Sequence, residues 1–158
     1  DLPNNTTLLL PKYSLTSLEP RYPSRILLNS SIVTPLACAL VINANDTSEL
    51  GNYGVDKVLN VNNSQLDTFN AKAYADVVKQ AAEKENSKVV IVSSSADSKY
   101  FTPLLAVGLQ AGFASNVVEA PSSMSPFTVK RTAFTNKAFN TMTIDTDVKI
   151  VAVSISMA

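Results

Sequence analysis

The sequence contains no histidine and only one cysteine, and these two scarcities exclude several classes of chemistry. Without histidine, the chain lacks the usual general base, the base of the serine-protease triad and the commonest metal ligand. Cys38 alone can form neither an internal disulfide nor a thiolate metal cage. Because Cys38 lies in the apolar run Leu-Ala-Cys-Ala-Leu, we interpret it as a buried structural thiol. The sequence therefore predicts no catalytic residue and no metal site.

An excess of charge and a long hydrophobic run are also absent. Lys plus Arg and Asp plus Glu both number 13, so no basic field attracts a nucleic-acid backbone or an anionic membrane. The longest apolar stretches are far shorter than the ~20 residues that span a bilayer, and Asp1 opens no signal sequence. We therefore expect no nucleic-acid partner, no membrane insertion and an intracellular location.

What the sequence does contain is enough apolar material for one folded domain. Of its 158 residues, 46% are hydrophobic and 16% are charged, which is close to ordinary globular composition. A domain of ~150 residues buries roughly two-thirds of its unfolded surface. From residue 36 onward, short β-branched runs alternate with helical patterns, which indicates an α/β layered fold with parallel strands.

The period of the apolar residues places individual elements. A short helix is expected after residue 45, with Asp46 and Glu49 as a capping box and Gly54 as its left-handed end. Longer helices are expected at residues 70–85 and at residues 98–110, the second ending at Gly112. The expected strands cover residues 36–42, 55–61, 88–92, 117–119, 127–134, 138–144 and 149–156. Since no helix separates the last four, we expect the domain to finish in antiparallel pairings.

Residues 1–35 follow neither pattern. Five prolines interrupt every candidate helix in this segment, and only residues 8–10 suggest a strand, which we place at an edge of the sheet. We therefore divide the chain into an atypical leader at residues 1–35 and an α/β domain at residues 36–158.

The segment at residues 93–99 is a candidate anion site, because it follows a buried strand and opens a helix. It contains no glycine that would let the backbone approach a phosphate closely. A hydroxyl-rich turn that caps the helix is the favoured interpretation. The mixed charges at residues 83–88 are interpreted as a solvated helix end.

Lys130 and Arg131 are neighbours in an expected strand, where both charges usually reach solvent. The alternative is that Arg131 contacts a partner subunit or a second domain, since arginine suits bidentate contacts with carboxylates or phosphates. Asn136 tolerates positive φ and predicts a hairpin turn at residues 134–137. Asp145 and Asp147 flank another turn and are ordinary turn residues rather than an acid and base pair.

Six segments, taken in order and spacing, resemble the amino-terminal domain of the electron transfer flavoprotein alpha subunit family. The resemblance implies a three-layer Rossmann-like α/β domain with a mainly parallel sheet and antiparallel strands near the C-terminus. It also implies an electron-carrier subunit rather than an enzyme, whose domain is a scaffold that binds the beta subunit. The resulting heterodimer would accept electrons from flavin dehydrogenases. The segments are residues 51–59, 74–78, 89–92, 99–109, 127–138 and 148–154.

The same resemblance implies FAD in the complete flavoprotein and AMP in the partner subunit. Because the family holds FAD in a second, carboxy-terminal domain, we expect this chain to have no cofactor-binding residue. Lys99, Arg131 and Asn136 are the positions implied to contact a partner subunit or a second domain. The implied location is the cytoplasm, or the mitochondrial matrix in a eukaryote.

The sequence departs from the family pattern at two places. Ser98 and Leu104 stand where the family often has glycine and arginine, and residues 1–35 lack the opening strand and long helix. We hypothesise that this segment is a shifted reading frame or a foreign leader. An alternative function of a different class is a stand-alone α/β module that binds a nucleotide or another small ligand.

Overall fold

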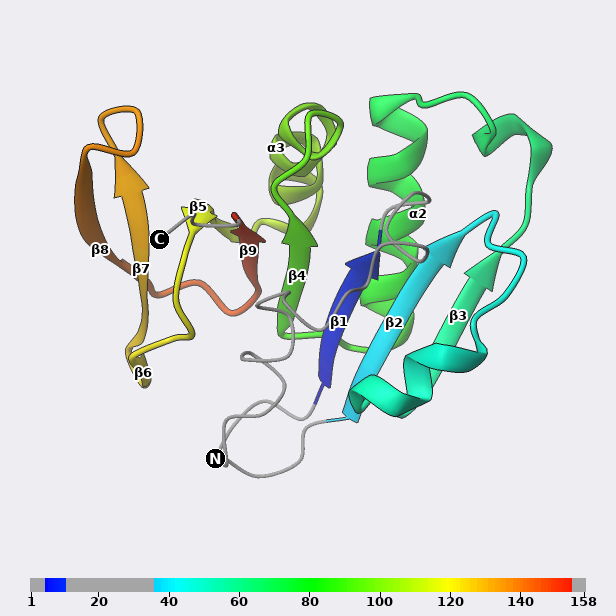
Figure 1. Cartoon of the computed structure of the whole chain (residues 1–158), viewed down its shortest axis with the longest axis horizontal. Coiled ribbons are helices and arrows are strands. Elements are labelled where there is room, and N and C mark those ends of the chain that lie inside the picture. The colour runs from blue at the N-terminus through cyan, green and yellow to red at the C-terminus, as the bar shows by residue number, and fades with distance from the viewer. Residues whose placement is uncertain (1–4, 11–35, 155–158) are drawn as a thin grey trace.

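The computed structural model describes residues 5–10 and 36–154, which form a nine-stranded sheet with helices against it (Figure 1). This arrangement confirms the expected α/β class. In chain order the elements are β1 (Asn5–Leu10), β2 (Leu36–Ile42), the 3-10 helix η2 (Ser48–Tyr53), β3 (Lys57–Val61), the 3-10 helix η3 (Ser64–Leu66), α2 (Ala71–Lys84), β4 (Val89–Ser93), α3 (Ser98–Leu109), β5 (Gly112–Val117), β6 (Ser123–Met124), β7 (Phe127–Ala133), β8 (Ala138–Ile144) and β9 (Lys149–Val153).

The sheet is mainly parallel, as predicted. Its strand order is β3-β2-β1-β4-β9-β5-β7-β6, and β8 pairs with β7. All pairings from β3 to β5 are parallel, whereas β5, β6 and β8 each pair with β7 in antiparallel fashion. The expectation that the chain finishes in antiparallel pairings is wrong for β9, which lies between β4 and β5. Its run Lys-Ile-Val-Ala-Val is buried in the middle, as is typical of an interior parallel strand.

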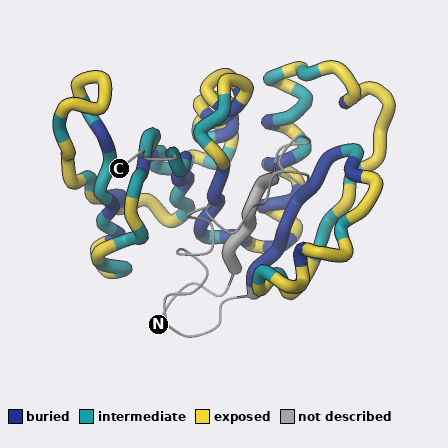
Figure 2. The backbone as a smooth tube through the Cα atoms, in the orientation of Figure 1, coloured by how far each residue is buried: buried dark blue, intermediate teal, exposed yellow. Residues whose placement is uncertain are grey.

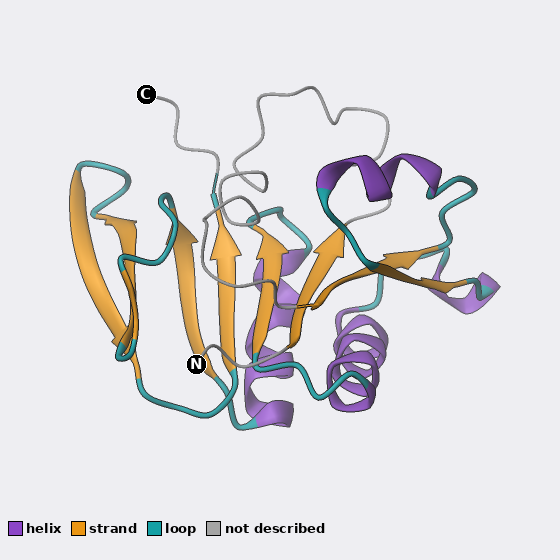
Figure 3. Ribbon diagram, turned by 90° about the horizontal axis from the view of Figure 1, so that it is seen from below, coloured by secondary structure: helices purple, strands orange, loops and turns teal. Residues whose placement is uncertain are grey.

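The helices are divided between the two faces by the direction in which the chain crosses the sheet. Figure 3 shows α2 and α3 on one side and η2 on the other. From β2 to β3 the chain moves outward, but α2 and α3 connect strands in the opposite direction. Because such crossovers are right-handed, this reversal moves the helices to the other face. The result is the expected three-layer arrangement.

Two apolar clusters fill the spaces between these layers. On the helical face, Val78 of α2 and Leu105 of α3 pack with Leu40, Val90 and Ile150 of the sheet. On the opposite face, a second cluster joins η2 to the central strands and to β7 and β8. Figure 2 shows buried positions running along β2 and β4. The central strands are therefore apolar on both faces, which explains their continuous hydrophobic runs.

Strand β1 corrects two expectations for the amino-terminal segment. It pairs in parallel with β2 on one side and β4 on the other, so it is an interior strand rather than an edge strand. An opening strand is therefore present. Its apolar run is short and unalternating, which is typical of a buried parallel strand but easily overlooked. Residues 1–4 and 11–35 lie outside the described residues, so the leader expectation for them stays a prediction.

Several element ends differ from the sequence-based expectation. Helix α3 ends at Leu109 and is followed by the C-cap residue Gln110, which has a left-handed φ of 51°. Gly112 begins β5 instead of ending the helix. The expected strand at residues 117–119 is therefore wrong, since β5 ends at Val117. Gly54 does end η2 with a φ of 84°, as predicted, but Thr47 rather than Asp46 is the N-cap residue.

The end of α2 is also less solvated than expected. Glu85 is only 8% exposed, and both of its carboxylate oxygens accept hydrogen bonds from Lys57 Nζ, at 2.8 and 2.9 Å. This hydrogen bond raises the pKa of Lys57. Cys38 pairs with Lys57 across the strands and is 2% exposed, and burial raises the pKa of its thiol. The interpretation of Cys38 as a buried structural thiol is confirmed.

The fold predicts that a charge at Val90 destroys the sheet. Val90 is fully buried in β4 between β1 and β9, so Val90→Lys places an unpaired charge in the core. We expect a loss of more than about 4 kcal/mol of unfolding free energy and no soluble expression. The matched control is Val107→Lys on α3, because Val107 is 80% exposed. The soluble yield and the thermal melting followed by circular dichroism are measured for both variants. Normal melting of Val90→Lys would refute the placement of β4.

Gly112 is predicted to tolerate no side chain. A Cβ atom there would lie 2.3 Å from Ile144 Cγ2 and 2.7 Å from Thr146 Oγ1. Gly112→Ala should therefore lower the unfolding free energy by about 1–3 kcal/mol, because the buried Ile144 must move. Gly51→Ala is the control, since no atom lies within 4 Å of its Cβ position. Urea denaturation gives both values, and equal midpoints for the two variants would contradict this account of the packing.

Candidate functional site

The carboxyl edge of the parallel strands is where this class of sheet usually binds its ligands. The strand order reverses between β1 and β4, because β1 leads to β2 on one side while β4 lies on the other. Crevices form outside the carboxyl ends of the strands at such a point. In the described part of the chain, the loop from Ser94 to Asp97, between β4 and α3, lies beside this point of the sheet.

Several polar groups of the loop after β4 are hydrogen-bonded within the protein. The backbone N–H of Ser98 donates to Ser95 Oγ at 3.2 Å, and Ser98 Oγ donates to the Ser95 carbonyl at 2.8 Å. The backbone N–H of Ser94 donates to the Val153 carbonyl at 2.8 Å. These bonds confirm the interpretation of a hydroxyl-rich helix cap. The loop has no glycine and does not fit the pyrophosphate of FAD, which needs a close approach of the backbone.

Strand register places Arg131 on this same edge. Ser93 at the end of β4 pairs with Val153 of β9, Val153 pairs with Val117 of β5, and Val117 pairs with Arg131 of β7. These residues form one row across the sheet. A bulge in β5 just before Val117, with Asn116 at a φ of 56°, lets the chain turn toward β7.

The other two expected contact residues also lie toward this edge. Lys99 is exposed in the first turn of α3, directly after the β4 loop. Asn136 lies in the turn between β7 and β8, and its φ of 63° confirms the expected hairpin. Figure 1 shows this turn and the start of α3 on the upper side of the molecule. No hydrogen bond or ion pair among the described residues joins Lys99, Arg131 and Asn136 to one another.

Arg131 is held in an unusual environment for a cation. Its Nη2 donates to Ser115 Oγ at 3.1 Å, and its Nη1 lies 4.0 Å from the sulfur of Met142. Its Nε is buried and has no acceptor. Arg131 is therefore partly buried at its Nε atom, although the residue as a whole keeps some exposure to solvent. Ser115 and Met142 carried no sequence signal, because they come from different strands and meet Arg131 only in the folded sheet.

Lys130 points to the opposite face of β7 and has the surroundings of an ordinary surface charge. It lies 2.6 Å from Glu119 Oε1 and 4.7 Å from the centre of the Phe139 ring. Both the carboxylate and the ring face compensate its charge. The two neighbouring cations on β7 therefore have different surroundings. Of the two, Lys130 has an acidic partner among residues 36–154, and Arg131 does not.

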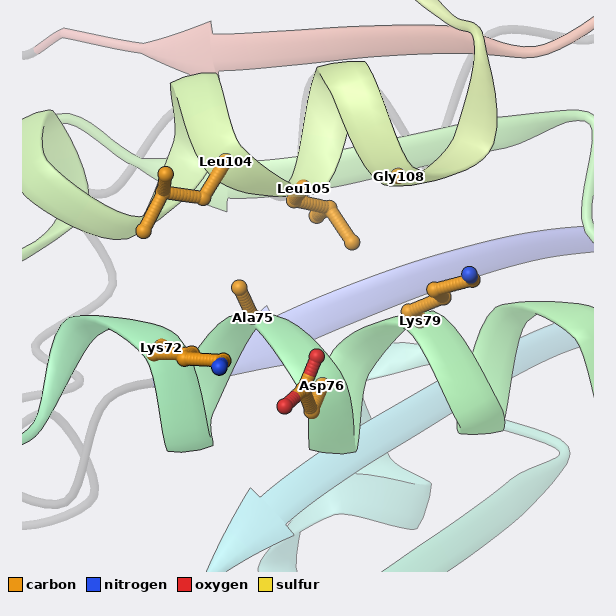
Figure 4. Close-up of a pocket in the computed structure, with 7 residues that line it drawn as sticks. All are labelled: Lys72, Ala75, Asp76, Lys79, Leu104, Leu105 and Gly108. Atoms are coloured by element: carbon orange, nitrogen blue, oxygen red, sulfur yellow. The ribbon is translucent and has the colours of Figure 1, made fainter.

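A groove between α2 and α3 is a second candidate, with a volume of about 270 Å³ (Figure 4). Its floor is apolar, with Ala75 and Leu105, and Lys72, Asp76 and Lys79 stand on α2 beside it. Pockets for small molecules and cofactors usually hold ~300–1,000 Å³, so this groove does not fit a dinucleotide. It lies between the two helices, beside the N-terminal half of α2.

Two further properties bear on function. Within residues 5–10 and 36–154, no group of three or more Cys, Asp and Glu side chains is arranged to hold a metal ion. None of the helices described here is long and apolar enough to cross a membrane.

Comparisons of the sequence with known proteins show which family the chain belongs to. The family model described as the electron transfer flavoprotein domain matches residues 33–157, and therefore nearly all of the sheet. The electron transfer flavoprotein subunit alpha of Bacillus subtilis (strain 168) is 35% identical over 104 residues, which are 66% of this chain and 32% of that protein. The chain spans about a third of the length of this relative. The chain therefore belongs to the electron transfer flavoprotein domain family, and it is similar to the alpha subunit.

Proposed function

We propose that this chain is the scaffold and subunit-binding domain of an electron transfer flavoprotein alpha subunit. It binds the beta subunit, and the heterodimer accepts electrons from flavin dehydrogenases. The chain is an electron-carrier subunit and catalyses no reaction of its own. Its place of action is the cytoplasm, or the mitochondrial matrix in a eukaryote.

The observation that carries this proposal is the extent of the family match. Residues 33–157 include β2 to β9 and both long helices, so the match extends over a whole layered domain rather than a short motif. A layered domain of this kind is suited to act as a scaffold that positions the beta subunit within the heterodimer.

Electron transfer by such a protein needs a redox cofactor, and the described residues do not fit one. The β4 loop lacks glycine, and the groove between α2 and α3 is too small for a dinucleotide. We therefore propose that FAD is held by a part of the flavoprotein outside this domain and that AMP lies in the partner subunit. The contribution of this domain is then structural.

The partner contacts are proposed at Lys99, Arg131 and Asn136. Each lies toward the carboxyl edge, on α3, on β7 and in the β7–β8 turn respectively. Phe134 in the same turn is 81% exposed and adds apolar surface there. Aromatic residues and arginine are favoured at the cores of protein interfaces, so this edge has a suitable composition.

The proposal predicts a colourless chain that forms a complex with the beta subunit of the same organism. Size-exclusion chromatography of the mixture should give an equimolar complex, and the purified chain alone should show no flavin absorbance. Titration calorimetry with AMP, ATP and FAD against the chain alone should show no heat of binding. A domain that binds one of these nucleotides tightly without any partner, and that ignores the beta subunit, would instead be a stand-alone nucleotide-binding module.

A further inference from the structure

We propose that Arg131 is the seat for one carboxylate side chain of the partner subunit. This inference rests on the proposed function above and assigns the chemistry of one contact within it. The seat comprises Arg131 of β7, Ser115 of β5 and Met142 of β8.

The first argument is an uncompensated charge. No carboxylate among residues 36–154 forms an ion pair with Arg131, and its two described contacts are a hydroxyl and a thioether. A hydroxyl oxygen and a thioether sulfur are weak acceptors compared with a carboxylate. Removing a cation from water is costly unless an anion lies against it. The folded chain therefore maintains a partly buried cation for which an anion has to come from elsewhere.

The second argument is the way in which the guanidinium is held. Arg131 lies on the same side of β7 as the buried Val129, and it is opposite Asn140 in the hairpin. The bond to Ser115 and the contact with Met142 fix the plane of the group from two neighbouring strands. The guanidinium has more N–H donors than these contacts use, and Arg131 is only partly buried. Such a fixed fork is suited to bidentate binding of a planar anion.

The third argument distinguishes a carboxylate from a phosphate. A phosphate group carries up to two negative charges and is usually held by several cations or by a run of backbone N–H groups. Here Lys130 faces the other side of the strand and is already paired with Glu119. In the β4 loop, Ser95 Oγ accepts a hydrogen bond from the backbone N–H of Ser98, and Ser94 Oγ donates to Asn116 Oδ1 at 3.4 Å, so both hydroxyl groups already have protein partners. A single fixed positive charge without such helpers matches the single negative charge of Asp or Glu.

Calorimetric titration with the beta subunit tests the seat. We expect Arg131→Met to weaken the complex at least about 30-fold, because the partner's carboxylate is left without its cation in the interface. Arg131→Lys keeps the charge but loses the fork, so its affinity should lie between those of Arg131→Met and the wild type. Lys130→Met is the matched control on the same strand, and it should stay within about threefold of the wild type.

The outcomes separate the two proposals. If the wild-type chain fails to bind the beta subunit, the proposed function falls and this inference falls with it. If the wild type binds the beta subunit, and both Arg131→Met and Arg131→Lys bind it as tightly as the wild type does, only this inference is overturned. If Arg131→Met does not fold, as judged by circular dichroism, the affinity of Arg131→Lys tests the inference. Weaker binding than the wild type then supports the inference, and wild-type affinity overturns it.

A second measurement needs no partner and no substitution of Arg131. The buried Nε–H of Arg131 should give a separate nuclear magnetic resonance signal, which sodium acetate should shift saturably at constant ionic strength while sodium chloride does not. Inorganic phosphate should act more weakly than acetate. A stronger response to phosphate would assign the seat to a phosphate ligand and overturn the carboxylate, and an unchanged signal with both anions would remove the seat altogether.

Discussion

The pairing of β4 between β1 and β9 is the constraint on which the rest of the structure depends. β4 is hydrogen-bonded on both sides, and Val89, Val90, Ile91 and Val92 are all buried, so it contributes to both apolar clusters. The reversal of strand order at β1 and β4 also sends α2 and α3 to one face and η2 to the other. The central position of β4 thus joins the two apolar clusters, and the reversal of strand order beside it divides the helices between the two faces.

The half of the sheet beyond β9 has a different character. There the chain forms the β7–β8 hairpin, whose outer surface exposes Phe139 and whose turn exposes Phe134. An antiparallel hairpin can leave one face solvated, whereas the parallel strands are covered on both faces. The molecule therefore combines a half built around buried parallel strands with a half that leaves more surface exposed. The proposed partner contacts at Arg131 and Asn136 belong to the second half.

The sequence predicted those elements whose local pattern and tertiary environment agree. The limits of β2 and β8 were predicted correctly, and α2 begins within one residue of its expected start at residue 70. Elements whose limits depend on distant residues were predicted less well. Gly112 looked like a helix end, yet it is glycine because Ile144 and Thr146 approach it closely from β8 and the following turn. Glu85 was expected to be solvated, but in the folded chain it is buried and paired with Lys57 of β3.

By itself, the sequence determined the α/β class, the mainly parallel sheet, the structural role of Cys38 and the resemblance to the electron transfer flavoprotein alpha family. These follow from composition, apolar period and the order of segments along the chain, which are local or linear properties. Only the tertiary structure decided that β1 and β9 are interior strands and that Arg131 lies against Ser115 and Met142 without an acidic partner. Strand order and side-chain surroundings arise from pairings between segments far apart in the chain, and no local pattern encodes them.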